Sequence, residues 1–180
     1  LERLPEVLGS LVGGRRVVVI ADQRTWDIAG RRAHDILGQS HWSVHDIVVP
    51  DGDRGGPVCD DITQDWLNTR LPPVDIALAV GSGVINDLTK WSAFDCCLPY
   101  AVMATAASMN GYTAANVAPT LQGVKTLIRA RAPLAVLAMP SVIVGAPFEL
   151  TSAGFGDVIA KPVSSADWLL NHVFYGEHFC

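Results

Sequence analysis

Short apolar runs alternate with amphipathic segments along most of the chain. Residues 16–21 (Arg-Val-Val-Val-Ile-Ala) are β-branched and apolar on both faces, which is typical of a buried strand. Residues 25–37 follow with apolar side chains at helical spacing, and Gly38 is predicted to stand just beyond the end of that helix. A second strand is predicted at 42–49, where Pro50 closes it.

The same alternation continues to about residue 138. Helices are predicted at 62–71 and 84–94, and strands at 74–80, 100–103 and 134–138. Strands that are apolar on both faces and separated by helices form a parallel sheet that is covered on both sides. The sequence therefore predicts a doubly wound, Rossmann-like α/β sheet, whose ligands bind beyond the carboxyl ends of the strands.

The character of the chain changes near its C-terminal end. Residues 148–180 have helix-like spacing and no strand pattern, and the predicted helix runs into Cys180. We therefore predict two parts: an α/β domain over residues 1–147, and the first helices of an all-helical domain over 148–180, which is incomplete in these 180 residues.

Composition narrows the class of protein. Hydrophobic residues make up 49% of the 180 residues and charged residues 17%, against roughly a quarter charged in an average domain. This excludes intrinsic disorder and suggests that some apolar surface is covered by a partner chain or a further domain. The net charge of −5 argues against a nucleic-acid partner, and no apolar stretch reaches the roughly 18 residues of a membrane helix.

Cysteine usage and the N-terminal residues bear on the cellular compartment. The four cysteines form no CxxC pair, so neither a disulfide framework nor a zinc knuckle is indicated. Residues 1–11 lack the basic-then-apolar order of a secretory signal. A reducing cytoplasm is the expected location.

A glycine-rich turn joins the predicted strand at 74–80 to the next helix. The sequence Gly81-Ser82-Gly83 lets the backbone approach a phosphate, and the first helical turn supplies N–H donors. Glycines at such turns also serve purely conformational needs, so both interpretations stay open. Asp87, expected in the first turn, is favoured there by the helix dipole, and Lys90 could reach a phosphate or pair with Asp87.

Two further segments carry polar groups. Residues 104–113 follow a predicted strand directly and are rich in hydroxyl groups, so they either bind a cofactor or cap a helix through a Thr or Ser. In the second segment Asp157 follows Gly-Phe-Gly, where it is either a helix N-cap or a metal ligand. The sequence contains no GxSxG motif, so serine hydrolase chemistry has no support. It also contains no pair of histidines at a spacing that could chelate a metal ion.

Together and in this order, three motifs resemble the glycerol-1-phosphate dehydrogenases. These belong to a superfamily of metal-dependent, "iron-containing" alcohol dehydrogenases, polyol dehydrogenases and dehydroquinate synthases. The motifs are Gly-Ser-Gly-Val-Ile-Asn-Asp-Leu-Thr-Lys at 81–90, Thr-Ala-Ala-Ser-Met-Asn-Gly-Tyr-Thr at 105–113, and Gly-Phe-Gly-Asp-Val-Ile-Ala-Lys at 154–161, followed by Ala-Asp-Trp at 166–168. The similarity spans about residues 17–180.

The resemblance implies an NAD(P)-binding site with a pyrophosphate turn at 81–83, further contacts to phosphate or ribose, and an acid near the adenosine half. The residues that it assigns to the cofactor are Asp22, Gly81, Ser82, Gly83, Asp87, Thr105 and Ser108. A carboxylate at position 22 accepts from ribose hydroxyls and repels a 2′-phosphate, which favours NAD over NADP.

The resemblance also implies a catalytic site between the two domains. It assigns Asn110 and Lys161 to catalysis, Asn110 to the substrate, and Asp157 to one divalent metal ion (zinc, nickel or iron), whose other ligands are histidines further along in the family. The implied reaction interconverts dihydroxyacetone phosphate and sn-glycerol 1-phosphate, with the metal as Lewis acid. The intact protein is expected to be a homodimer, and this chain alone to bind cofactor with little or no turnover.

Two alternatives remain. Residues 83–88 also lean toward a dehydroquinate-synthase-like cyclase, whereas the motifs at 154–168 favour the dehydrogenase. Asn110 stands where polyol-oxidising relatives usually carry Asp, and an amide cannot carry a proton. That departure motivates the second alternative, a catalytically inactive nucleotide-binding module.

Overall fold

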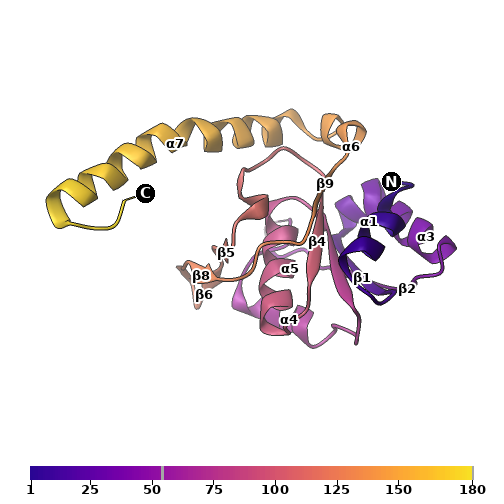
Figure 1. The fold of residues 1–180 in the computed structure, drawn as a ribbon. Coiled ribbons are helices and arrows are strands. Elements are labelled where there is room, and N and C mark those ends of the chain that lie inside the picture. Colours follow the sequence, from indigo (N-terminus) through magenta and orange to yellow (C-terminus); the bar gives the residue numbers. More distant parts are fainter. Residues whose placement is uncertain (54, 180) are drawn as a thin grey trace.

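Five parallel strands form the central sheet of the computed structural model, which describes residues 1–53 and 55–179 (Figure 1). Their spatial order is β2-β1-β3-β4-β9. The strands are β1 (Arg16–Asp22), β2 (Ser43–Val49), β3 (Ile76–Gly81), β4 (Tyr100–Ala104) and β9 (Val136–Ala138). All five predicted strands are confirmed, with ends that shift by at most two residues.

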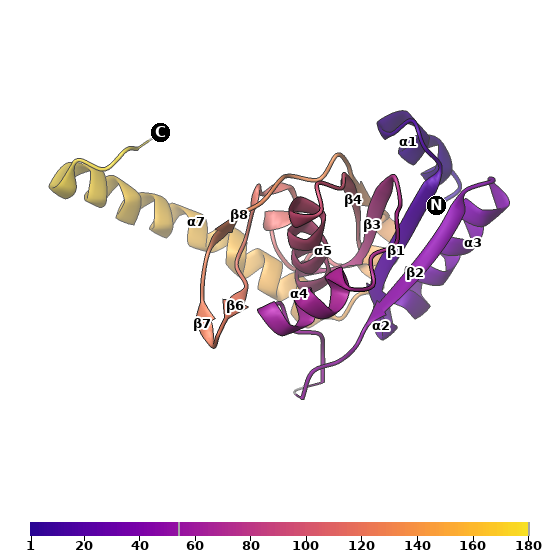
Figure 2. The same ribbon diagram turned by 90° about the horizontal axis from the view of Figure 1, so that it is seen from below.

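Helices cover both faces of this sheet. Figure 2 shows α1 (Leu4–Leu11) and α3 (Arg31–Gln39) on one side, and α4 (Asp61–Asn68) and α5 (Gly83–Asp95) on the other. Alternate residues of β1 join two separate cores, with Val17 packed toward α1 and α3 and its neighbour Val18 toward α4 and α5. The predicted doubly wound architecture is confirmed.

The helical segment after β1 differs from its prediction. It begins earlier, with α2 (Gln23–Thr25), continues through a π-helical turn (Trp26–Gly30), and leads into α3. Gly38 lies inside α3 and Ser40 is the C-cap, so the predicted glycine terminus was wrong. The helix starts at Gln23 because the carboxylate at the end of β1 caps it.

Short strands that the sequence did not predict lie between β4 and β9. A 3-10 turn (Gly111–Thr113) precedes them. The antiparallel pairs are β5 (Asn116–Val117) with β8 (Ile128–Arg129), and β6 (Thr120–Leu121) with β7 (Val124–Lys125). Elements of two residues are too short to show a hydrophobic period, which is why pattern analysis missed them.

A single long helix ends the described chain. After the short α6 (Pro140–Val144), the 28-residue α7 (Phe148–Tyr175) extends away from the sheet (Figure 1). We expected several helices and a continuation into Cys180, but α7 ends at Tyr175, and Cys180 lies outside the described residues. Many apolar side chains of α7 are exposed. No described helix is both long and apolar enough to span a membrane.

Candidate active site

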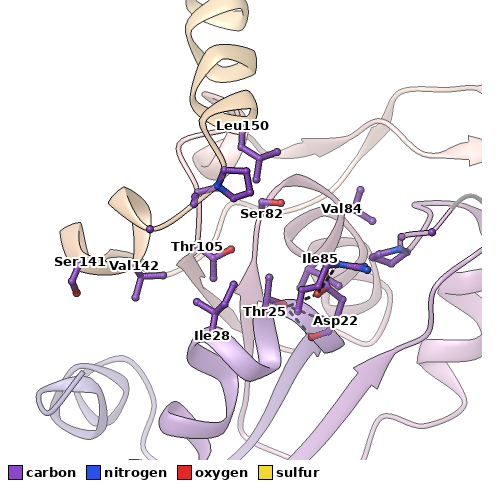
Figure 3. Close-up of a pocket in the computed structure, with 18 residues that line it drawn as sticks. Asp22, Thr25, Ile28, Ser82, Val84, Ile85, Thr105, Ser141, Val142 and Leu150 are labelled. Carbon is purple, nitrogen blue, oxygen red and sulfur yellow. Dashed lines mark hydrogen bonds and ion pairs between the residues drawn. The ribbon is translucent and has the colours of Figure 1, made fainter.

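A cavity of about 660 Å³ opens at the carboxyl ends of β1, β3 and β4. Figure 3 shows Asp22 and Thr25 on one side of it and Leu150 on the other, with Ser82 and Thr105 between them. Parallel sheets bind ligands at this edge, and the volume lies within the usual range for cofactor and substrate pockets. The predicted location of the site is therefore matched by a real cavity.

Asp22 closes one end of the cavity and caps the helix that follows β1. Its Oδ1 accepts the backbone N–H of Thr25 at 2.9 Å, and the Asp22 N–H donates to the Thr25 hydroxyl at 3.1 Å, which makes a reciprocal capping box. The residue is buried, with 8% of its surface exposed. Its Oδ2 accepts no hydrogen bond from the described residues, so that oxygen remains free for a ligand.

Arg24 lines the same end of the cavity and is held from behind by Asp51. Its Nη1 and Nη2 donate to Asp51 Oδ2 and Oδ1 at 3.0 and 2.7 Å, while its Nε lies 3.7 Å from Asp22 Oδ1. The hydrogen bond between Arg24 and Asp51 raises the pKa of Arg24 and lowers the pKa of Asp51. Sequence analysis did not identify Arg24, although its position two residues after the strand-end acid was a usable signal.

The glycine turn between β3 and α5 has two distinct features. A Cβ on Gly81 would lie 2.6 Å from the Cβ of Ile85, so this glycine is required for packing against the helix. A Cβ on Gly83 would lie 3.4 Å from Met109 Sδ, which is ordinary contact. Ser82 is the N-cap of α5, yet its side chain makes no capping hydrogen bond. The start of α5 thus lies at the cavity wall without a side-chain cap.

Asp87 and Lys90 of α5 form a partly buried ion pair. Lys90 Nζ lies 3.3 Å from Asp87 Oδ1 and also donates to the carbonyls of Gly111 and Asn116 at 3.4 and 3.1 Å. The Lys90 side chain is fully buried. Because α5 begins at Gly83, Asp87 lies in the second turn, which corrects the first-turn prediction. Neither side chain lines the cavity, and Lys90 pairs with Asp87, one of the two predicted alternatives.

The segment that follows β4 borders the cavity at its first two residues, Thr105 and Ala106. Thr105 is buried, lines the cavity, and donates its N–H to the Gly81 carbonyl at 3.1 Å. Ser108 is half-buried and lies outside the cavity lining. Tyr112 donates its hydroxyl to the Ala106 carbonyl at 2.7 Å, and burial raises its pKa. The short turn here has Asn110 at its N-cap without a side-chain bond, so capping by Thr or Ser was wrong.

The third motif lies within α7 and contacts the second. Asp157 Oδ2 accepts the backbone N–H of Asn110 at 2.8 Å. A Cβ on Gly154 would overlap the carbonyl oxygen of Ala107, so only glycine permits this approach. Asp157 is in the middle of the helix, which rules out the N-cap alternative. Lys161 is exposed one turn further along.

The structure gathers some of the predicted residues and leaves others apart. Of the predicted cofactor residues, those in the cavity wall are Asp22, Ser82 and Thr105. Gly81, Gly83 and Asp87 do not line the cavity, and neither do Asn110 and Asp157, which contact each other. The α6–α7 side of the cavity, which includes Leu150, was not predicted, because apolar residues near a helix start carry no distinctive signal.

No cluster of three or more His, Cys, Asp or Glu side chains that could hold a metal ion occurs in the described ranges 1–53 and 55–179. Asp157 is the single predicted ligand, and its Oδ2 is occupied by the Asn110 N–H. These residues alone do not form a metal centre.

Comparison with known proteins connects this geometry to a family. The model for iron-containing alcohol dehydrogenases matches residues 1–147. The glycerol-1-phosphate dehydrogenase [NAD(P)+] of Geobacillus stearothermophilus is 37% identical over 169 residues, covering 92% of this chain and 41% of the relative. The enzyme of the same name from Pyrococcus furiosus is 33% identical over 163 residues, covering 91% and 45%. This chain therefore spans less than half the length of these relatives.

Solved structures show the same fold. A glycerol dehydrogenase from Schizosaccharomyces pombe superimposes with a TM-score of 0.76 at 22% identity, covering 88% of this chain and 40% of that one. A 1,3-propanediol oxidoreductase gives a TM-score of 0.75 at 19% identity, covering 90% and 47%. The match to the family of iron-containing alcohol dehydrogenases extends over most of the chain, and the fold of the chain agrees with that match. The chain belongs to the iron-containing alcohol dehydrogenase family.

Proposed function

We propose that this chain is the cofactor-binding part of an NAD(P)-dependent glycerol-1-phosphate dehydrogenase. The observation that carries the proposal is the cavity at the carboxyl edge of the sheet, with the uncapped start of α5 in its wall. The similarity of the chain's sequence to relatives named as glycerol-1-phosphate dehydrogenases [NAD(P)+] supports the same assignment. The whole protein would interconvert dihydroxyacetone phosphate and sn-glycerol 1-phosphate.

The start of α5 would bind the cofactor's pyrophosphate. The first N–H groups of a helix have no intrahelical partner and lie at the positive end of the helix dipole, so they attract phosphate oxygens. The 13-residue α5 places these groups at the cavity wall, and the Ser82 hydroxyl, which makes no cap bond, lies beside them. Thr105, on the end of the adjacent strand, would donate its hydroxyl to phosphate or ribose.

Asp22 would bind the adenosine ribose. Its Oδ1 is engaged by the Thr25 N–H, and its Oδ2 would accept a ribose hydroxyl. When bound, the cofactor supplies the hydride that reduces the ketone. The chain's own residues orient it: the α5 turn and Thr105 hold its centre, and Asp22 holds its adenosine end. On this basis we propose a preference for NAD over NADP.

The substrate end of the site is proposed near the contact between Asn110 and Asp157. Asn110 is exposed and would donate its amide hydrogens to a substrate oxygen, and Lys161 would attract the substrate phosphate. Asp157 would serve as one ligand of a divalent metal. Since the described residues form no metal centre by themselves, the proposed site requires further ligands.

Titration with reduced cofactor tests the proposal directly. Energy transfer from the five tryptophans to NADH should be saturable. Thr105→Val should weaken the binding of NADH by about twofold to tenfold, which is the effect of losing one hydrogen bond. Thr126→Val, on the remote β6–β7 hairpin, should change nothing. Absence of saturable binding would refute the cofactor assignment.

Product analysis then tests the reaction on the full protein. Dihydroxyacetone phosphate should be reduced with net consumption of NADH. Release of inorganic phosphate without net NADH consumption would instead support the cyclase alternative, and binding without either reaction would support the inactive module. Light scattering on the same sample tests the proposed homodimer.

A further inference from the structure

The adenosine end of the cavity holds one cation between two carboxylates. Of the described residues that line the cavity, Asp22 and Arg24 are the only charged ones. Asp51 stands behind Arg24, just beyond the end of β2, and forms a two-point ion pair with it. In the paired register of β1 and β2, Asp22 lies opposite Val49, two residues before Asp51. All three charged groups thus meet at the same edge of the sheet.

An arginine at this position has the chemistry to bind a 2′-phosphate. The guanidinium group offers five donors in a planar arrangement that suits phosphate, and NADP-binding sites of this fold class place an arginine near the ribose. Arg24 is half exposed, with 50% of its side chain accessible, and reaches the cavity next to the proposed ribose acceptor. Considered alone, it would favour NADP.

Asp51 changes that expectation. It occupies both terminal nitrogens of Arg24, at 3.0 and 2.7 Å, on the face that a phosphate would otherwise use for two-point binding. The remaining nitrogen, Nε, is directed toward Asp22 at 3.7 Å. One positive charge is therefore matched by two negative ones. A 2′-phosphate, which brings about two further negative charges, finds no uncompensated cation among the described residues that line the cavity.

We propose that Asp51 is a specificity-determining residue that keeps Arg24 from binding a 2′-phosphate, so that the cavity selects NAD over NADP. The proposal rests on the proposed cofactor function. It assigns the selectivity to the ion pair of Arg24 with Asp51 in addition to Asp22. It also implies a latent NADP site, which becomes usable when the charge of Asp51 is removed.

The test compares NADH with NADPH on the chain and its Asp51→Asn variant. Energy transfer from tryptophan gives both dissociation constants, and their ratio is the readout. Wild type should bind NADH more tightly. In Asp51→Asn the ratio should move toward NADPH by roughly tenfold, because Arg24 gains a charge-assisted bond to the 2′-phosphate. Adenosine 2′,5′-bisphosphate against ADP, as competitors, should show the same shift.

Two further variants separate this role from a merely structural ion pair. Asp53→Asn removes the same charge from the same loop, and no ion pair of Asp53 occurs among the described contacts; its ratio should match wild type. Arg24→Gln combined with Asp51→Asn should lose the gain in NADPH affinity. A general loss of stability would weaken the binding of both cofactors together and leave the ratio of their dissociation constants unchanged.

The outcomes distinguish the two proposals. If neither cofactor binds the wild type, the proposed function fails, and the selectivity proposal fails with it. If both cofactors bind but Asp51→Asn leaves their ratio unchanged, or if wild type prefers NADPH, the selectivity proposal alone is overturned. If Asp53→Asn shifts the ratio as much as Asp51→Asn, loop charge rather than the Arg24 ion pair sets the preference, and the proposal is again overturned.

Discussion

Replacing Lys90 with methionine removes the cation that joins α5 to the segment following β4. The Lys90 side chain is fully buried and its ammonium has three acceptors: Asp87 Oδ1 and the carbonyls of Gly111 and Asn116. Methionine preserves the length of the side chain but donates no hydrogen bond. The two carbonyls lose their charged donor, and Asp87 retains only the side-chain amide of Asn86 at 3.1 Å among these partners.

The magnitude follows from how far each group is buried. Removing one partner of a buried ion pair costs about 3–5 kcal/mol, because the other charge is left without compensation. The Asp87 side chain is 24% exposed, so water solvates part of its charge and the lower end of the range applies. We expect a loss of about 3 kcal/mol in the free energy of unfolding, which lowers the Tm by roughly 6–12 °C for a domain of this size.

Urea denaturation followed by circular dichroism measures this loss. Lys125→Met, on an exposed strand of the β6–β7 hairpin, is the matched control and should be nearly neutral. Lys90→Met combined with Asp87→Leu should recover part of the stability, because an apolar pair leaves no uncompensated charge. A loss below about 1 kcal/mol for Lys90→Met, or one equal to that of Lys125→Met, would refute the reasoning.

Three further predictions concern single residues. Gly81→Ala should cost about 1–3 kcal/mol through overpacking, since its Cβ would lie 2.6 Å from a neighbouring Cβ, while thermal melts of Gly83→Ala should show a smaller change. Asp22→Ala should cost about 1 kcal/mol by loss of the helix cap, measured by urea unfolding; a neutral result would contradict the capping role. Burial raises the pKa of the Cys59 thiol to about 12, so at pH 8 it should be alkylated far more slowly than exposed Cys97 in peptide-resolved mass spectrometry; equal rates would contradict it.

The centre of the sheet could be predicted from the sequence because β1, β3 and β4 are buried on both faces. The runs 17–21 and 76–80 leave no polar face, which is typical of strands in a sheet that is covered on both sides. The position of the cavity followed from the same topology, since ligands of such sheets bind at the carboxyl edge. The family resemblance assigned Ser82 and Thr105 to the cofactor, and both residues line this cavity.

The remaining features depend on contacts between distant segments, which local patterns do not encode. Asp157 accepts from Asn110 across 47 positions, and Arg24 pairs with Asp51 across 27. Gly81 matched a phosphate-binding motif, but its absent side chain is explained by packing against the helix. A motif therefore identified the correct turn, while the structure was needed to show which of its residues line the cavity.

Bonds to backbone groups, together with the Tyr112 hydroxyl, hold the segment 105–113 between the cavity and α7. The Thr105 N–H is bound by the Gly81 carbonyl, the Gly111 carbonyl by Lys90, and the Asn110 N–H by Asp157. Bonds to the backbone of a residue do not depend on its side chain, so the side chain of Asn110 takes no part in holding the loop. A polar side chain that is exposed, anchored through its own N–H and structurally dispensable is suited to contacting a substrate. These contacts leave the Asn110 side chain unused in folding, which supports the proposed contact between Asn110 and a substrate.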